Sequence, residues 1–424
     1  MPIVSAMTVA GKRVADRITL DVPSSEQVTP QRGFRAPGTA RMITGSLAGA
    51  VLAYLFQVIG GRRLGTTGFA PIAILWTAYF IVATVILVPL EQYVTREAGR
   101  GRRVLRHHGR ALLAFIGGAG LLMGGFVFVT RNELFLGDLA FVWQGALVVI
   151  TYGIFQIGKG VLAGHRRFAE YGLVLTVEGV VRLIAAIVFL GIAVSAISLG
   201  WAMVCAPLGI LLLRPWRYDR ETVEGVDATR PTGFLSQYVL GSTASQLLLA
   251  GAPLGLVALG GNEHLQSVVF VTFTLYRAPL TLIYNLQGRI LSLLVRRDQH
   301  DVRRLVARVA VGGLALVAVA GLVGWTVGPG VVGLLYGEEF RPGAVVAGLV
   351  AAGVIAASLT QLLSQSLVAS GSIGALASAW VGGLIAGVAA MLVSSGGPDF
   401  RVAFGFIVGE LVALGLACWR TIRR

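Results

Sequence analysis

Stretches of about 20 apolar residues, the length that a helix needs to cross the hydrocarbon core of a bilayer, recur along nearly the whole chain. Only 13% of the 424 residues are charged, whereas a soluble globular domain carries about 25% charged residues. The sequence therefore predicts an all-α polytopic membrane protein with twelve transmembrane helices. The candidate spans lie near residues 42–60, 69–89, 111–130, 138–158, 171–189, 193–213, 235–259, 265–288, 309–326, 344–367, 373–394 and 402–419.

Positive charge is distributed unevenly between the predicted loops. With the spans laid alternately across the membrane, 28 of the 35 lysines and arginines fall on the side of the two termini and five on the other side. Cytoplasmic loops of membrane proteins carry the positive excess. Both termini are therefore expected in the cytoplasm, and topology rather than nucleic-acid binding explains the net charge of +15.

Polar segments divide the chain into four parts. Residues 1–41 are basic and contain three prolines, which predicts a disordered cytoplasmic tail without a signal peptide. Residues 42–213 then form an N-terminal six-helix bundle, and residues 235–424 form a C-terminal one. The longest polar interior stretch, residues 214–234, is the expected cytoplasmic linker between the two bundles.

Three charged side chains stand out within or beside the fourth and fifth spans. Glu178 and Arg182 are four residues apart, so they share one helix face in the order that favours an ion pair. Lys159 lies near the end of the preceding span, where a lysine can also extend to the membrane surface. Because charges at membrane depth are costly, all three are candidates either for a structural role or for binding a polar substrate.

The spans of the second half carry the remaining candidates for a binding site. Arg277 lies in the eighth span and either pairs with Glu410 or contacts a phosphate group. Gln246 in the seventh span, and Gln361 and Gln365 in the tenth, stand among serines and threonines. Interhelical hydrogen bonds account for any one of these side chains. A polar surface shared by three spans predicts the wall of a water-filled cavity.

Glycines occur in pairs four residues apart in several spans, a spacing that lets membrane helices approach closely. Within one polytopic chain this spacing predicts internal packing rather than a dimer motif, and we expect the protein to act as a monomer. The two cysteines, Cys205 and Cys418, both fall in spans and indicate neither a disulfide nor a metal site. No cofactor is expected. The three glycine pairs with this spacing are Gly120/Gly124, Gly160/Gly164 and Gly383/Gly387.

Three stretches of the chain resemble the bacterial polysaccharide flippases of the multidrug/oligosaccharidyl-lipid/polysaccharide (MOP) exporter superfamily. The first is PLEQYVTREAGRG at residues 89–101, where Pro89 should kink or interrupt the second span. The second, residues 160–183, is similar to a glycine-rich basic turn and the helix that follows it. The third is LLYGEEFRPGAVV at residues 334–346. The plan of six plus six spans covers nearly the whole chain.

This resemblance implies two six-helix bundles in a V around a central cavity, in the plasma membrane of a bacterium. It also implies an undecaprenyl-linked glycan as substrate, flipped by alternating access for cell-surface polysaccharide or lipopolysaccharide biosynthesis. An anionic, hydroxylated head needs fixed cations for phosphate and amides for sugars. Arg277, Arg182 and Lys159, together with the glutamines named above, supply those groups. Membrane lipids are the other expected partner.

Three other functions remain open from the sequence. A cation-coupled multidrug exporter of the same superfamily needs a carboxylate in the membrane. Exporters of this kind often place an acid in the first span, and residues 42–60 contain none, although Glu178 and Glu410 remain available. A membrane enzyme generally needs charged catalytic groups on a sizeable outer loop, and the outer loops here are short and sparsely charged. A scaffold that transports nothing is the third alternative.

Overall fold

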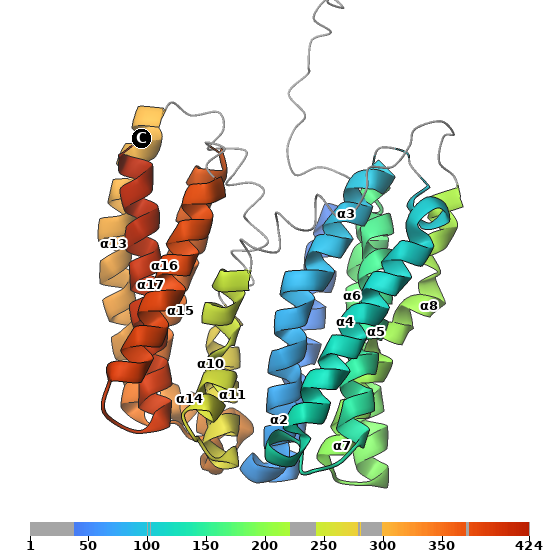
Figure 1. The fold of residues 1–424 in the computed structure, drawn as a ribbon, viewed down its shortest axis with the longest axis horizontal. Helices are drawn as coiled ribbons and strands as arrows, with labels where there is room; N and C mark the ends of the chain where they lie inside the picture. The colour runs from blue at the N-terminus through green and yellow to red at the C-terminus, as the bar shows by residue number, and fades with distance from the viewer. Residues whose placement is uncertain are drawn as a thin grey trace, which may run out of the picture.

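The computed structural model describes residues 38–99, 101, 103–220, 243–278, 280, 299–369 and 373–423, and every regular element in these ranges is a helix. The helices form two bundles that lie side by side (Figure 1). The N-terminal bundle contains α2 (Thr39–Val82), η1 (Ala83–Leu87), α3 (Val88–Gly99), α4 (Val104–Leu134), α5 (Ala140–Gly164), α6 (Phe168–Ile192), α7 (Ala196–Cys205), η2 (Ala206–Gly209), α8 (Ile210–Leu213) and η3 (Pro215–Arg220). The C-terminal bundle contains α10 (Ala252–Ala258), α11 (Glu263–Tyr276), α13 (Gln299–Thr326), α14 (Gly328–Tyr336), η4 (Glu338–Phe340), α15 (Ala344–Ala369), α16 (Ile373–Val393) and α17 (Pro398–Ile422).

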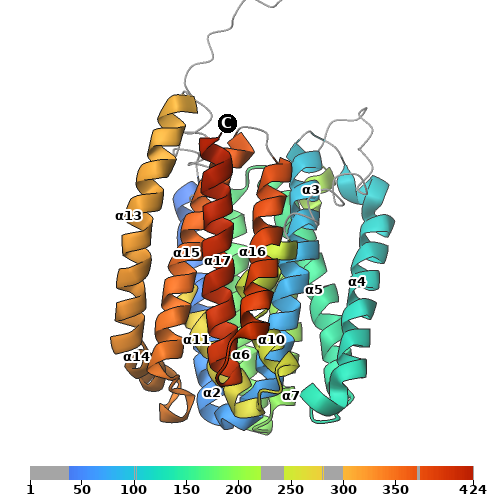
Figure 2. The ribbon, with the colours of Figure 1, turned by 60° about the vertical axis from the view of Figure 1, so that its left-hand side comes forward.

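Helix lengths confirm a multi-pass membrane protein. Within the described ranges, eight helical stretches are long and apolar enough to cross a bilayer, or nine if the bent pair α13 and α14 counts as one span. These spans are consistent with the predicted twelve, some of which include residues outside the described ranges. Figure 2 shows α13 at the outer edge of the C-terminal bundle, beside α15.

The helix α2 is two membrane crossings rather than one. Its backbone leaves the helical region at Gly65, where φ is 69° and ψ is 179°. Phe56 and Trp76 stack with ring centroids 5.6 Å apart, although 20 residues of straight helix would extend about 30 Å. The chain therefore reverses at Gly65, between the first two predicted spans. A positive φ is unfavourable for any residue with a Cβ atom, so glycine suits this turn.

The second crossing contains the irregularity that was predicted near Pro89. A buried π-helical turn, η1, comes just before α3, and Pro89 is the second residue of α3. Proline has no N–H group and its ring collides with the carbonyl one turn earlier in a regular α-helix. The wider π turn relieves this conflict, so the helix continues through the proline with a local change of register.

The glycine pairs pack inside the bundles, as predicted. A Cβ atom on Gly160 would lie 2.8 Å from the carbonyl oxygen of Glu91, which places α5 directly against α3. A Cβ atom on Gly383 would lie 2.7 Å from the carbonyl oxygen of Gly409, so α16 and α17 are equally close. Gly120 and Gly124 lie against Ala146 in the same way. These positions bring neighbouring backbones together within one chain.

The two bundles contact each other at the end of the molecule that is remote from the C-terminus (Figure 1). Arg62, beside the reversal in α2, donates hydrogen bonds to the carbonyl oxygens of Leu335 and Leu334 at 2.7 and 2.5 Å. The hydroxyl of Ser267 in α11 donates to the carbonyl oxygen of Thr66 at 2.6 Å. We call the contacts of residues 62–69 with α11, α14 and η4 the far-end seam.

Aromatic rings extend the far-end seam toward the middle of the molecule. Phe69 of α2 packs against Phe270 of α11 and Phe340 of η4, with centroid distances of 5.9 and 6.3 Å. The segment at residues 334–346, which resembles a family motif, therefore contributes to the contact between the bundles. The opposite end of the molecule, where α3 ends, α4 begins and α17 ends, carries most of the arginines that the structure describes, and we call it the basic end.

The predicted linker begins inside the N-terminal bundle. Its first residues form η3, which packs against α4 and α5. Residues 221–242 and residues 1–37 of the predicted tail at 1–41 lie outside the described residues. The first helix begins at Thr39, three residues before the predicted span, so the last residues of the predicted tail are helical.

Candidate functional site

The charged pair predicted on the fifth span forms a buried network with a tyrosine. Glu178 and Arg182 on α6 make an ion pair, and their side chains are 8% and 6% exposed. The hydroxyl of Tyr152 on α5 donates to the Glu178 carboxylate and accepts from Nη2 of Arg182 at 2.7 Å. The three groups compensate one another's charge and polarity, which is what burying charges in a membrane bundle requires, although Nε of Arg182 is buried without a hydrogen-bond partner in the described part of the chain.

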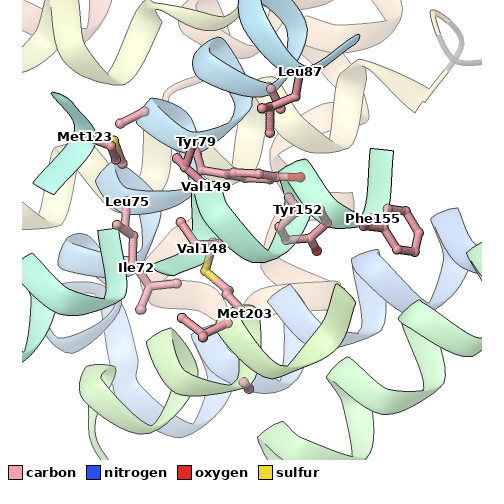
Figure 3. Close-up of a cluster of buried hydrophobic side chains, with 14 of the residues drawn as sticks. Ile72, Leu75, Tyr79, Leu87, Met123, Val148, Val149, Tyr152, Phe155 and Met203 are labelled. Atoms are coloured by element: carbon pink, nitrogen blue, oxygen red, sulfur yellow. The ribbon is translucent and has the colours of Figure 1, made fainter. Parts of the chain in front are cut away.

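Aromatic rings enclose this network. The Arg182 guanidinium lies 5.1 Å from the ring centroid of Trp76 and 6.0 Å from that of Phe56, both on α2. Cation–π contacts of this kind offset part of the lost hydration of a buried arginine. Tyr79 of α2 packs against Tyr152 at a centroid distance of 4.4 Å, and Figure 3 shows the two rings side by side in the apolar core.

Lys159 belongs to a second network nearer the basic end. Its ammonium group contacts Oε2 of Glu91 on α3 at 2.9 Å and donates to Oε1 of Gln156 at 2.7 Å. The hydroxyl of Tyr171 on α6 donates to the other oxygen of Glu91 at 2.8 Å. Lys159 is only 8% exposed, so it neutralises an acid inside the bundle rather than extending to the surface.

The two networks share the helices that build them. Tyr152 and Lys159 are seven residues apart on α5, and Tyr171 and Glu178 are seven apart on α6. Residues at this spacing lie on one helix face, two turns apart. Phe155 fills the space between the networks, because its ring contacts Tyr152 at 5.9 Å and lies 5.6 Å from the Lys159 ammonium. Two neutral pairs therefore follow each other along the interior of the N-terminal bundle.

Arg277 lies where the two bundles meet. It is the C-cap residue of α11, one turn beyond Thr274, whose carbonyl oxygen accepts a hydrogen bond of 3.0 Å from Tyr54 of α2. Its guanidinium is near enough to Tyr54 and to Glu410 of α17 to affect their ionisation, but both carboxylate oxygens of Glu410 are buried without a hydrogen-bond partner among the described residues. Glu410 is fully buried, whereas Arg277 is partly exposed. The cation is thus the more accessible of these two groups.

The predicted amides are only partly brought together with these charges. Gln361 on α15 is buried, and Gln246 is half-buried in the helical residues 243–250. The side chain of Gln365 lies outside the described part of α15. The hydroxyls of Thr272 and Thr360 each donate to a carbonyl oxygen one turn earlier in their own helices. These hydroxyls therefore use their donors within their own helices, and the predicted polar wall depends on the amides.

Sequence reasoning identified the charged residues but missed several of their partners. Tyr152, Tyr171 and Trp76 complete the networks, and each looks like an ordinary core residue in the sequence. The spacing of seven that relates Tyr152 to Lys159 and Tyr171 to Glu178 is the signal that indicates a shared face. Among the described residues, no three His, Cys, Asp or Glu side chains gather as ligands of a metal ion.

Sequence comparison gives uncharacterized relatives. No family model matches the chain. Two uncharacterized proteins of Mycobacterium tuberculosis are each 26% identical to it, over 400 and 429 residues. The alignments cover 89% and 92% of this chain and 90% and 95% of the relatives, so the similarity extends through both bundles.

Solved structures show which fold this is. The inward-facing conformation of a multidrug resistance MATE family transporter of the MOP superfamily has a TM-score of 0.66 at 11% identity, covering 90% of this chain and 98% of that chain. A MOP superfamily transporter from Pyrococcus furiosus, described as having a binding pocket of reverse polarity, has a TM-score of 0.64 at 14% identity. That match covers 91% of this chain and 95% of the Pyrococcus furiosus chain. The chain has the fold of MOP superfamily transporters, as the sequence predicted.

Proposed function

We propose that this protein is a membrane transporter that flips a lipid-linked oligosaccharide or polysaccharide precursor for cell-surface glycan biosynthesis. The observation that carries the proposal is the position of Arg277 at the junction of the bundles, where it is partly exposed while the nearby acid Glu410 is fully buried. A diphosphate-linked head is anionic, and an arginine binds phosphate oxygens through charge-assisted hydrogen bonds. Gln361 and Gln246 supply amides from the same bundle for sugar hydroxyls.

The charge balance of the N-terminal bundle disfavours the alternative, export of cationic drugs, whereas the buried Glu410 of the C-terminal bundle is an acid that such an exporter could still use. Two acids of the N-terminal bundle, Glu178 and Glu91, are each in contact with a basic side chain of the protein itself. A cationic substrate would have to displace Arg182 or Lys159 and leave that cation buried without its partner, which costs several kcal/mol. An anionic substrate that binds at Arg277 would leave both of these ion pairs intact.

Alternating access assigns a role to the far-end seam. With the termini in the cytoplasm, this seam lies on the outer side of the membrane and keeps that side shut. Helices α2 and α11 are also joined by the hydrogen bond from Tyr54 to Thr274, and this bond lies close to Arg277. A substrate bound at Arg277 is therefore placed beside the contact that must part before release to the outside. Rigid-body movement of one bundle against the other is a general plan for such transporters.

Lipid-linked intermediates in the native host test the proposal. We expect a deletion strain to accumulate them and lose surface glycan, and Arg277→Ala at normal protein levels to behave like the deletion. Arg277→Lys should restore part of the flux, because a lysine keeps the charge but loses the planar, two-pronged geometry. Arg341→Ala, which removes an exposed arginine paired with Glu338, is the matched control and should behave as wild type. Unchanged lipid pools in the deletion strain would contradict the proposal.

A further inference from the structure

A cavity of about 370 Å³ opens at the basic end of the N-terminal bundle, and its lining includes no residue of the two buried ionic networks. It lies between the first turn of α4 and the short helix η3, which follows the last span of this bundle. Its wall combines guanidinium groups with apolar side chains. The lining residues are Arg103, Leu105, Arg106, Trp216 and Asp219.

The acid in this wall is already engaged by the protein. The Asp219 carboxylate accepts hydrogen bonds from the backbone N–H groups of Val104 and Leu105, both at 3.1 Å. It thereby satisfies free donors at the beginning of α4 and fastens η3 to that helix. Burial raises the pKa of Asp219 above 3.8, while the backbone hydrogen bonds and His165 lower it. The carboxylate therefore serves the helix terminus, and the two lining arginines outnumber this one acid, so the ionised lining carries a net positive charge.

Further arginines are fixed beside the cavity. The guanidiniums of Arg167 and Arg217 lie 4.4 and 4.9 Å from the ring centroid of Tyr218, the neighbour of Asp219. Arg217 also donates a hydrogen bond of 2.8 Å to the Tyr218 hydroxyl. The basic turn at residues 165–167 is thereby brought against η3. Three separate segments of the chain concentrate positive charge around one small cavity.

We propose that this cavity binds the phosphate headgroup of an anionic phospholipid from the leaflet on the basic side. Arg103 and Arg106 supply the cations that phosphate oxygens require. Trp216 and Leu105 supply an apolar surface for the glycerol and the first methylenes of the chains. Basic pockets at the cytoplasmic ends of membrane helices bind such headgroups, and tryptophan is enriched at that depth. A small soluble anion would use the arginines but would gain nothing from the apolar half.

The position of the site connects it with the relation between the bundles. The helix η3 is the last described element before residues 221–242, which join the two bundles. A lipid held between α4 and η3 fastens the start of this connection to the N-terminal bundle. We therefore expect occupancy to stabilise the protein at the basic end and to make its stability depend on lipid composition, whatever substrate the transporter carries.

Lipid titration of the purified full-length protein in detergent tests this site. Native mass spectrometry and thermal unfolding are followed with added phosphatidylglycerol, phosphatidylcholine or inorganic phosphate. We expect tight binding and a raised Tm with phosphatidylglycerol alone. The variant Arg103→Gln/Arg106→Gln should bind phosphatidylglycerol about tenfold more weakly or worse. The control Arg131→Gln/Arg341→Gln loses the same net charge at the other end of the molecule and should bind as wild type.

Two results would overturn the site. Equal weakening in the charge-matched control would show that net charge, and not this cavity, attracts the lipid. An equal response to inorganic phosphate at the same phosphorus concentration would assign the cavity to a soluble anion instead. Arg106→Gln alone changes an exposed side chain and keeps the test valid if the double variant does not fold. Unaltered phosphatidylglycerol binding in that variant would also count against the proposal.

Discussion

Glu178 and Arg182 lie one turn apart on α6 and form an ion pair in the interior of the N-terminal bundle, joined by the hydroxyl of Tyr152. Breaking such a pair leaves one charge buried without compensation, which costs about 3–5 kcal/mol. Removing both charges can cost much less. We expect Glu178→Gln and Arg182→Met each to lower the Tm strongly, and the double variant to recover part of the loss, as measured by thermal unfolding in detergent.

The exposed pair at the start of the same helix provides the control. Arg167 and Glu170 form an ion pair of 3.2 Å, with side chains 45% and 31% exposed. Surface pairs contribute about 0–1 kcal/mol. Glu170→Gln should therefore leave the Tm nearly unchanged. A loss equal to that of Glu178→Gln would show that charge at any point of α6, rather than burial, determines stability.

The sequence predicted the interior pair but not the residues around it. The spacing of Glu178 and Arg182 is local and follows from helix geometry, as does the length of each span. The partner of Lys159 is Glu91, in another span, and the meeting of these residues depends on how α3 and α5 are rotated. Hydropathy contains no information on that rotation. The same limit applies to Arg277, whose neighbours Tyr54 and Glu410 belong to two other helices.

The Lys159–Glu91 pair should stabilise the protein in either orientation, with the lysine on α5 and the glutamate on α3 or the reverse, as long as the two charges are opposite. Lys159→Glu should prevent normal accumulation, because two carboxylates would then face each other in the bundle. Adding Glu91→Lys restores an ion pair and should recover part of the folded protein. Fluorescence-detected size-exclusion chromatography measures both. Failure of the double variant to exceed Lys159→Glu would contradict a pairwise role.

A cross-link between Thr66 and Ser267 should lock the far-end seam shut. Thr66→Cys and Ser267→Cys replace two residues that are linked by a hydrogen bond of 2.6 Å across the bundles. In a background without Cys205 and Cys418, we expect a short thiol cross-linker to join them and to stop transport. The control pair is Ser195→Cys with Ser198→Cys, whose hydroxyls are in contact within the N-terminal bundle. This pair should cross-link without stopping transport, because the cross-link does not join the two bundles. Transport unaffected by the first cross-link would show that the seam does not open.

Close packing of α16 on α17 predicts opposite results for two glycines of α17. A Cβ atom on Gly409 would lie 2.8 Å from the carbonyl oxygen of Gly383, whereas one on Gly415 would meet nothing within 4 Å. Gly409→Ala should therefore destabilise the protein by about 1–3 kcal/mol through overpacking. Gly415→Ala should be neutral or slightly stabilising, because alanine favours helix. Thermal unfolding of the two variants in the same detergent distinguishes them.

Asp219 should make a pH-dependent contribution to stability. Its pKa in the folded protein is raised above 3.8 by burial, so folding favours the protonated acid. The stabilising contribution is complete below 3.8 and is lost as the pH rises through the raised value. Asp219→Asn removes this titration while keeping one acceptor for Val104 or Leu105. The Tm of the wild type minus that of the variant should fall as the pH increases from below 3.8, and a constant difference would contradict the assignment.

The reversal at Gly65 bears on how the chain enters the membrane. The two crossings of α2 are joined without a soluble loop, so they should insert together as a helical hairpin. Arg62 and Arg63 lie at its tip, and the cytoplasmic termini predicted from the loop charges would require their translocation to the outer side. Each charge moved against the membrane potential costs about 2.3 kcal/mol per 100 mV. Because the reversal needs a positive φ at Gly65, a side chain there would disfavour the hairpin. Such a substitution would therefore impair the insertion of the first two crossings, before any contact between the bundles exists.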